Sequence, residues 1–207
     1  MSAYEDSYFA HGLRLMDVGD YEGAVAMFDK ALKLGLGDLA EIHVCRGEAM
    51  AYLGKWQAAE DSVNEALKLQ PYLATAYNER GNIYRLQGML DKALNDYTMA
   101  IHIEPDYDEA FYNRALAYES RRRYADAEAD FTMALRINPK LGQVYEARGR
   151  VRAKQFKYDL AVADISAYLK SGAAREFDNH SEMQGYLIIL RVQRLLWRLL
   201  PWRRGGS

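Results

Sequence analysis

Apolar and small side chains recur every three to four residues between Tyr77 and Pro105, which is the spacing of one face of an α-helix. One run starts at Tyr77 and includes Gly81, and a second run begins at Leu90. Gly88 lies between the runs and favours a turn. Pro105 ends the second run, because proline cannot continue a helical hydrogen-bond ladder. The pattern therefore predicts two helices joined by a tight turn.

The same pattern returns at an interval of 34 residues, most visibly where Phe111–Pro139 repeats Tyr77–Pro105. A small residue recurs at one position of the first helix, at Gly12, Gly47, Gly81, Ala115 and Gly149, and an alanine recurs at one position of the second, at Ala24, Ala59, Ala93, Ala127 and Ala161. Five copies result, over about 5–38, 40–73, 74–107, 108–141 and 142–175. Because one helical hairpin cannot bury its apolar face alone, we expect the copies to stack.

This pattern resembles the tetratricopeptide repeat, with aromatic–small–aromatic spacing on the first helix, Ala-x3-aromatic-x2-Ala on the second, and then proline. The resemblance implies an all-α fold, a right-handed α-solenoid of helix-turn-helix repeats, with a concave groove that binds peptides or partner proteins. It spans residues 1–175 as one solenoid. The fifth copy departs from the pattern at Arg152, Tyr168 and Ala173, and the first copy departs at Leu36, as expected of terminal copies.

Composition fits a folded protein, with 50% hydrophobic and 27% charged residues. The net charge of −2 is the sum of +5 after Met183, where five arginines and no acid occur, and −7 before it. An acidic body with a basic tail does not suit a general nucleic-acid binder. The single cysteine, Cys45, cannot form an internal disulfide. We see no secretory signal and no ordinary membrane span, and therefore expect a cytoplasmic protein, possibly peripheral at a membrane.

No motif for chemistry stands out. The sequence has no phosphate-binding loop, no dinucleotide fingerprint and no zinc-ligand spacing, and its four histidines are scattered. No nucleophile–base pair is suggested. We therefore expect no catalytic residues, no metal and no cofactor.

Four arginines follow the repeat, at Arg46, Arg80, Arg114 and Arg148. They permit an anion-binding ladder. Aspartates stand 16 residues after the last three of them, at Asp96, Asp130 and Asp164, while the second copy has Ser62 there beside Asp61. The co-occurrence favours arginine–aspartate pairs between the two helices of each hairpin.

The candidate ligand groove is formed by the face of each first helix that the recurring packing residues do not use. Its residues follow one another at spacings of three and four. In the repeat family this face lines the concave side. Its polar and aromatic positions predict a ligand site made of Glu48, Asn78, Asn82, Arg85, Tyr112, Glu119, Glu146 and Arg150. The mixture of amides, acids, arginines and a tyrosine suits an extended or helical peptide.

Chaperone-binding members of the family grip a C-terminal dicarboxylate with cations and two asparagines. Asn82 and Asn113 match those asparagines, but Asn78, Gln143 and Glu146 stand where the cations would be. A carboxylate facing Glu146 without those cations would be repelled. We therefore do not expect this chain to bind chaperone tails.

A loop is expected over 176–181, a basic amphipathic helix over 182–200 with a capping box at Ser181 and Gln184, and a tail over 201–207. The first half of the helix suits a cap on the fifth copy. Its apolar arc is wider than one neighbour can bury, so we expect Trp197 and Trp202 to be less well covered. The candidate interaction residues of this C-terminal segment, helix and tail together, are Arg191, Arg194, Trp197, Arg198 and Trp202.

The sequence thus predicts a shape rather than a chemistry. The leading hypothesis is a non-enzymatic adaptor that binds a protein or peptide segment in its groove. The alternative is a peripheral membrane or homodimeric scaffold that uses residues 183–204. An enzyme is the least favoured hypothesis.

Overall fold

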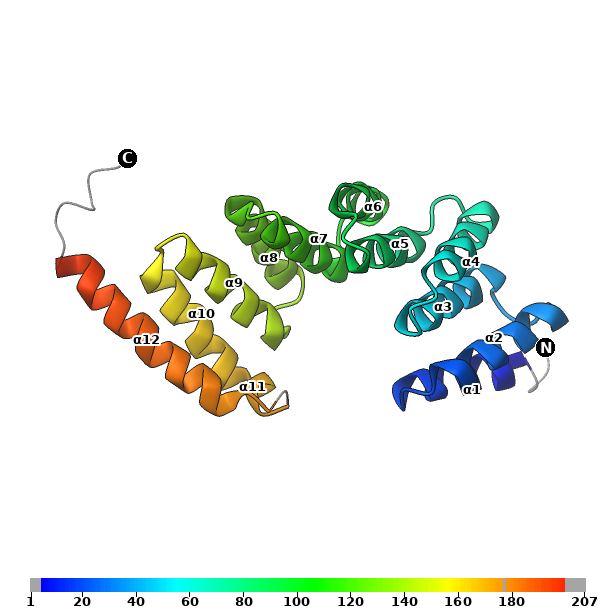
Figure 1. The fold of residues 1–207 in the computed structure, drawn as a ribbon, viewed down its shortest axis with the longest axis horizontal. Coiled ribbons are helices and arrows are strands. Elements are labelled where there is room, and N and C mark those ends of the chain that lie inside the picture. Colours follow the sequence, from blue (N-terminus) through cyan, green and yellow to red (C-terminus); the bar gives the residue numbers. More distant parts are fainter. Residues whose placement is uncertain (1–4, 177, 200–207) are drawn as a thin grey trace. The chain divides into compact units, whose positions relative to one another are not determined.

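The computed structural model describes residues 5–176 and 178–199, without the side chains of Glu5–Ser7, Glu176 and Arg198. Within these ranges the chain is all helix and turn, with no strand. It forms two compact units, Met1–Asp106 and Tyr107–Ser207 (Figure 1). The all-α prediction is confirmed.

The first unit contains three helical hairpins. They are formed by α1 (Glu5–Asp17) with α2 (Tyr21–Leu34), α3 (Leu39–Tyr52) with α4 (Trp56–Leu69), and α5 (Ala74–Leu86) with α6 (Leu90–Ile103). The first helix of each hairpin is called here the A helix and the second the B helix. Each hairpin also packs on the next, through α2 with α3 and through α4 with α5.

The second unit contains two hairpins and a further helix. The hairpins are α7 (Asp108–Ser120) with α8 (Tyr124–Ile137) and α9 (Gly142–Lys154) with α10 (Tyr158–Ser171). A single-turn helix, α11 (Ala173–Glu176), precedes α12 (His180–Leu199). α12 lies along α10, as Figure 1 shows.

A notch at one A-helix glycine lets the two helices of a hairpin approach closely. At Gly81 an added Cβ would lie 2.6 Å from the ring of Tyr97, and at Gly149 it would lie 2.9 Å from Ile165. Tyr97 and Ile165 are fully buried B-helix residues, so neither has room to move away. The recurring small residue is therefore a packing requirement.

The turn inside each hairpin needs one residue with a left-handed backbone. Gly19, Gly54 and Gly88 supply it in the first unit. In the second unit Arg122 (φ 58°) and Phe156 (φ 61°) adopt the same conformation, which costs a residue with a Cβ about 1 kcal/mol. Phe156 gains a compensating contact, because its ring stacks on Trp197 with the ring centroids 5.1 Å apart.

The recurring arginine joins three helices. Arg80 donates from Nε and Nη2 to both carboxylate oxygens of Asp96 at 2.8 Å, and from Nη1 to Asn64 Oδ1 at 2.8 Å. Asp96 belongs to the B helix of the same hairpin and Asn64 to the B helix of the preceding one. Arg80 therefore holds its own hairpin together and ties it to its neighbour.

The predicted pairing is confirmed in all three hairpins that have the aspartate. Arg114 pairs with Asp130 at 2.7 Å, and Arg148 pairs with Asp164 at 2.7 Å. In the second copy, Arg46 donates to the Ser62 hydroxyl at 3.2 Å. Its carboxylate partner is Asp29 of α2, at 2.6 Å, and not the neighbouring Asp61.

Arg152, which departs from the family pattern, replaces an aromatic contact with charge. It donates to Asp164 Oδ2 at 2.7 Å and to Glu128 Oε1 of the preceding hairpin at 2.8 Å. Gln155 and Lys157 donate to the second oxygen of Glu128, at 3.0 Å and 2.6 Å. Burial alone would raise the pKa of Glu128, but these hydrogen bonds from Lys157, Arg152 and Gln155 outweigh it and lower that pKa.

The C-terminal segment differs from prediction in three details. α12 begins at His180 rather than 182, so Ser181 lies inside the helix and the predicted capping box is wrong. Part of the expected loop is helical, because α11 extends to Glu176. Tyr168 fills this corner, buried and donating from its hydroxyl to Asn179 Oδ1 at 2.9 Å. The predicted end of the helix at 200 lies outside the described residues.

We predict opposite effects for the same substitution at two helical glycines. Gly81→Ala should lower the free energy of unfolding by about 1–2 kcal/mol, because the new methyl group meets Tyr97. Gly185→Ala should raise it by up to about 1 kcal/mol, because nothing lies within 4 Å of the new Cβ and alanine favours helix. Urea denaturation followed by circular dichroism measures both. Equal effects at the two sites would contradict the claim that close packing at Gly81 leaves no room for a methyl group.

A second prediction concerns the buried ion pairs. Asp164→Ala should lower the free energy of unfolding by about 3 kcal/mol, because Arg148 loses its carboxylate partner in a mostly buried position and Arg152 keeps only Glu128. Glu65→Ala serves as the control, since Glu65 pairs with Lys68 at the exposed surface. The same denaturation experiment should show little change for the control. A comparable loss in both variants would mean that burial of the pair is unimportant.

Candidate functional site

Three of the predicted ligand residues line one pocket of the first unit. Glu48 of α3 and Asn82 and Arg85 of α5 surround a cavity of about 150 Å³, together with Ala51, Tyr52, Glu79 and Leu86. Two carboxylates, a guanidinium and an amide thus face one opening. Such groups can hydrogen-bond both the carbonyl and the amide groups of a peptide.

A core residue orients two of these side chains. Tyr97, which fills the Gly81 notch, donates from its hydroxyl to Asn82 Oδ1 at 2.9 Å and accepts from Arg85 Nε at 3.3 Å. Asn82 Nδ2 in turn donates to Glu79 at 3.2 Å. The pocket residues are therefore held from below by the packed interior of their own hairpin.

Asn78 does not share this position. It is 2% exposed, so the prediction that it lies open on the groove is wrong. Asn113, the second asparagine of the chaperone-type pattern, is also buried, at 6%. Helical spacing places Asn78 on the free face, whereas Asn113 matches only the chaperone-type pattern, and the structure buries both.

Cys45, the single cysteine, is influenced by the carboxylates of this surface. Burial raises the pKa of the Cys45 thiol to about 12, and the carboxylates of Glu48, Glu41 and Glu79 contribute. The thiol is therefore protonated at neutral pH and is a poor nucleophile. Cys45 is a packing residue, held against the cluster that contains Phe28 and Ile42.

In the second unit, Tyr112 of α7 lines a cavity of about 300 Å³ with Asp108, Glu109, Leu141 and Gln143. Its ring also packs at an angle against Phe131, with the centroids 5.8 Å apart. An aromatic ring fixed beside two carboxylates offers an apolar contact within a polar surface.

The remaining predicted groove residues, Glu119, Glu146 and Arg150, meet in a second cluster of this unit. Arg150 pairs with Glu146 and reaches Glu182 of α12 at 3.7 Å, and Lys154 pairs with Glu119 at 2.6 Å. A cavity of about 360 Å³ lies here, lined by Glu119, Arg150, Lys154, Glu182, Met183 and Tyr186. The predicted face thus extends onto α12.

Sequence reasoning missed Lys154, Glu182 and Tyr186. Lys154 follows Arg150 by one helical turn, so the helical spacing could have included it. The other two belong to α12, which packs beside α10, and only the tertiary structure brings Glu182 to Arg150.

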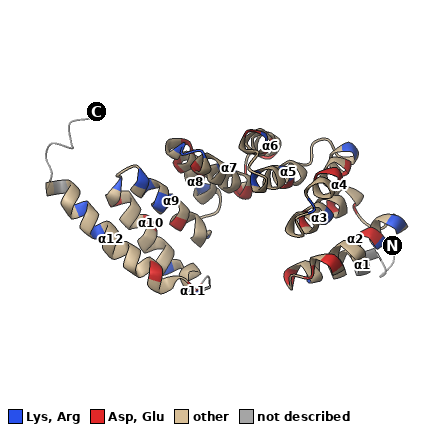
Figure 2. Ribbon diagram, viewed as in Figure 1, with Lys and Arg blue, Asp and Glu red and all other residues tan. Residues whose placement is uncertain are grey.

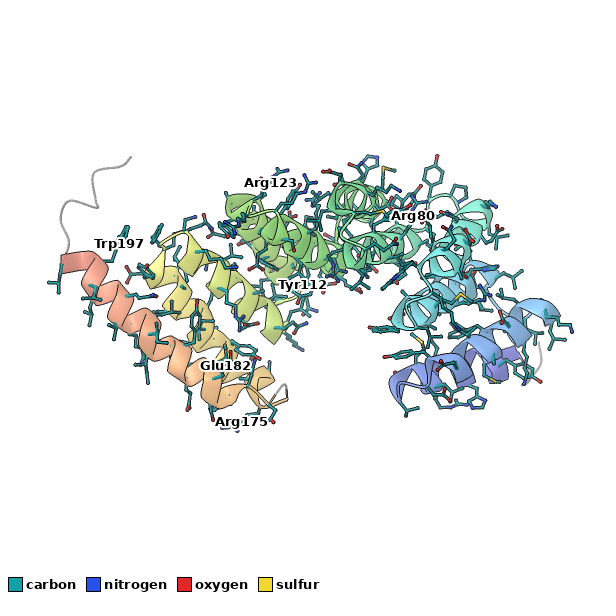
Figure 3. All side chains as sticks on the ribbon, viewed as in Figure 1. Arg80, Tyr112, Arg123, Arg175, Glu182 and Trp197 are labelled. Carbon is teal, nitrogen blue, oxygen red and sulfur yellow. The ribbon has the colours of Figure 1, made fainter. Side chains whose placement is uncertain are left out.

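The tail residues divide between two sides of α12. Arg194 faces α10 and lies 3.6 Å from Asp159, and Trp197, which is labelled in Figure 3, packs on Phe156 and Tyr158. Trp197 is half-buried and so, as predicted, less well covered than Met183, Leu187 and Leu190 in the first part of the helix. Arg191 is exposed. The Arg198 side chain and Trp202 lie outside the described residues. Figure 2 shows the one acid of α12 at its start and cations further along.

Other chemistry finds no support in the described part of the chain. There, no group of three or more histidine, cysteine, aspartate or glutamate residues is placed to hold a metal ion. None of the described helices combines the length and hydropathy needed to cross a bilayer. The recurrent arginines are bound to acidic or polar side chains, so they do not form an open anion ladder.

Stacked helical hairpins with polar A-helix faces define an α-solenoid interaction module. Three family models match the chain, two described as tetratricopeptide repeat over residues 9–72 and 108–141 and one as TPR repeat over residues 81–121. The chain belongs to the tetratricopeptide repeat family.

Solved structures share the fold. The TPR protein TTC0263 of Thermus thermophilus has a TM-score of 0.74 and 21% identity, over 89% of this chain and 99% of that one. The pilF protein of Pseudomonas aeruginosa has a TM-score of 0.73 and 19% identity, over 94% and 96%. The heat shock protein STI1 of Saccharomyces cerevisiae is 28% identical over 97 residues, which are 47% of this chain and 16% of that protein.

We predict that Glu146 titrates above its ordinary value of 4.5. Burial raises its pKa; Arg150 opposes this, and Glu119 and Glu182 add to it. Protonation of Glu146 therefore stabilises the fold. That contribution is complete below the unfolded pKa and is lost as the pH rises through the folded pKa.

Carboxyl NMR titration measures the midpoint directly, with Glu146→Gln used to assign the signal. Relative to Glu146→Gln, the natural chain should lose stability between pH 4.5 and neutrality. A midpoint at or below 4.5 would show that the ion pair with Arg150 dominates instead.

Proposed function

We propose that this protein is a non-enzymatic adaptor that holds a peptide or protein segment against the A-helix faces of its repeats. The observation that carries the proposal is the pocket shared by Glu48, Asn82 and Arg85, because side chains from two successive A helices converge there. Membership of a repeat family with protein partners supports the same role.

The ligand chemistry follows from the lining groups. A segment bound across α3 and α5 meets Glu48, Glu79 and Arg85, which all line the pocket. Its backbone N–H groups can donate to the carboxylates, and its carbonyls can accept from Arg85 or Asn82. Because Tyr97 fixes Asn82 and Arg85 in advance, little side-chain freedom is lost on binding.

A chaperone tail is not the proposed ligand, despite the partial similarity to STI1. Asn113 is buried rather than free to bind a carboxylate. Glu146 carries an acid where such a site would need a cation, and its neighbours Glu119 and Glu182 are acids as well.

The alternative, a membrane-peripheral or homodimeric scaffold, stays a prediction, as does a cytoplasmic location. Such a scaffold would use the surface of α12, where large aliphatic side chains are exposed. This surface is separate from the pocket at α3 and α5, so the two roles can be tested independently.

The adaptor role is tested with a triple variant, Glu48→Ala, Asn82→Ala and Arg85→Ala. The immobilised variant should retain its helical content but capture partners from a cell extract at least about tenfold less efficiently, which corresponds to a loss of roughly 1.4 kcal/mol of binding energy. Quantitative mass spectrometry of the captured proteins gives the readout.

A matched control carries Lys33→Ala, Glu65→Ala and Asn95→Ala, which remove a cation, an acid and an amide from exposed positions on B helices. The control should capture the same proteins as the natural chain. If the groove variant also captures them undiminished, the ligand binds elsewhere.

A further inference from the structure

α12 occupies the position of an A helix. Leu187 stands two residues after Gly185 and is buried against Ala161 and Ile165 of the preceding hairpin. In the first unit, Ile83 stands two residues after Gly81 and is buried in the same way against the preceding hairpin. The two helices therefore use the same register to pack on the hairpin before them.

The partner that every other A helix has is missing from α12. Each of the glycines at 12, 47, 81 and 149 faces a large side chain of its own B helix, so close that a Cβ would collide with it. Around Gly185, no atom lies within 4 Å of the position that a Cβ would take. Among the described residues, then, α12 is an A helix with an open notch.

The open side is strongly apolar. It continues from the notch along the helix through Ile188, which is 61% exposed, Val192, which is 49% exposed, and Leu199, which is 74% exposed. Ile189, Leu195 and Leu196 are exposed beside them. The spacing of residues 185, 188, 192, 195 and 199 alternates three and four, which is the seam that one helix offers to another.

Charge selects the kind of helix that fits. Arg191 is exposed at the edge of this seam, while Arg194 is turned toward Asp159 of α10. After Glu182 the sequence has no acid as far as Ser207. A second copy of α12 would bring arginine toward arginine, whereas acidic side chains beside an apolar seam would be attracted.

We propose that this face of α12 binds an amphipathic α-helix of another protein. The partner helix carries acidic residues beside its own apolar seam. A large apolar side chain of that helix enters the notch at Gly185, as Tyr97 enters the notch at Gly81. The acidic residues pair with Arg191. The bound helix completes a hairpin whose first member is α12.

Two synthetic peptides of equal length test the proposal, both with the same leucine seam, one flanked by glutamates and the other by lysines. Each is labelled and titrated with the full chain, and fluorescence anisotropy gives the affinity. The acidic peptide should bind at least about tenfold more tightly than the basic one. Arg191→Glu should reduce or reverse that preference. Equal binding of the two peptides by the natural chain overturns the proposal.

Gly185→Leu separates helix docking from a general attraction to apolar surfaces. It fills the notch without disturbing the fold, since nothing lies near Gly185, and should weaken the acidic peptide about tenfold. Val192→Glu should do the same. Val18→Glu is the control, at a valine that is even more exposed (77% against 49%) and lies in the other unit, and should leave the affinity unchanged. Unweakened binding by Gly185→Leu and Val192→Glu overturns the proposal.

Two other occupants give different results. If vesicles containing phosphatidylserine bind the chain and Gly185→Leu strengthens that binding while the peptide fails to bind, the face belongs to a membrane. If light scattering shows a dimer that Val192→Glu dissociates, the face belongs to a second copy. Either result overturns the proposal. The Glu48, Asn82 and Arg85 variant should bind the acidic peptide normally, which separates this surface from the groove.

Discussion

The structure depends on how closely two helices can approach. At Gly47, Gly81 and Gly149 the backbone of an A helix meets a side chain of its B helix with no room for a methyl group. That closeness removes water from the hairpin interior and allows a single large residue to seal it. The opposite faces stay apolar, and only a neighbouring hairpin can cover them. The hairpins therefore stack because each one, once closed at its glycine, still has apolar faces that it cannot cover itself.

Polar groups make this stacking specific. Apolar faces alone would tolerate sliding between hairpins, whereas Arg80 must reach Asp96 in its own hairpin and Asn64 in the one before. The groove inherits this order, since Tyr97 both closes the notch and holds Asn82 and Arg85. The candidate binding surface and the core thus share a residue, and a change in the packing of α5 on α6 would also change what the surface presents.

Helix positions and the arginine–aspartate pairs were predictable because both depend on spacing within one hairpin. The burial of Asn78 was not, because spacing along one helix does not say which of its positions the rest of the fold covers. The joining of Glu182 to Arg150 was equally hidden, since it depends on how α11 sets the start of α12. The lower coverage of Trp197 was predictable from the width of the apolar arc, but its contact with Phe156 was not, because Phe156 comes from a turn whose left-handed conformation the sequence gives no reason to expect.

Cys45 is the only cysteine of the chain, and it packs against the cluster that joins α3 to the first hairpin, with its thiol kept protonated. A thiol reagent in solution therefore reacts with it slowly while α3 is packed on α1 and α2, and rapidly once they separate. The rate of labelling reports how often this contact opens. The natural chain thus carries a single-site reporter of local opening between its first and second hairpins.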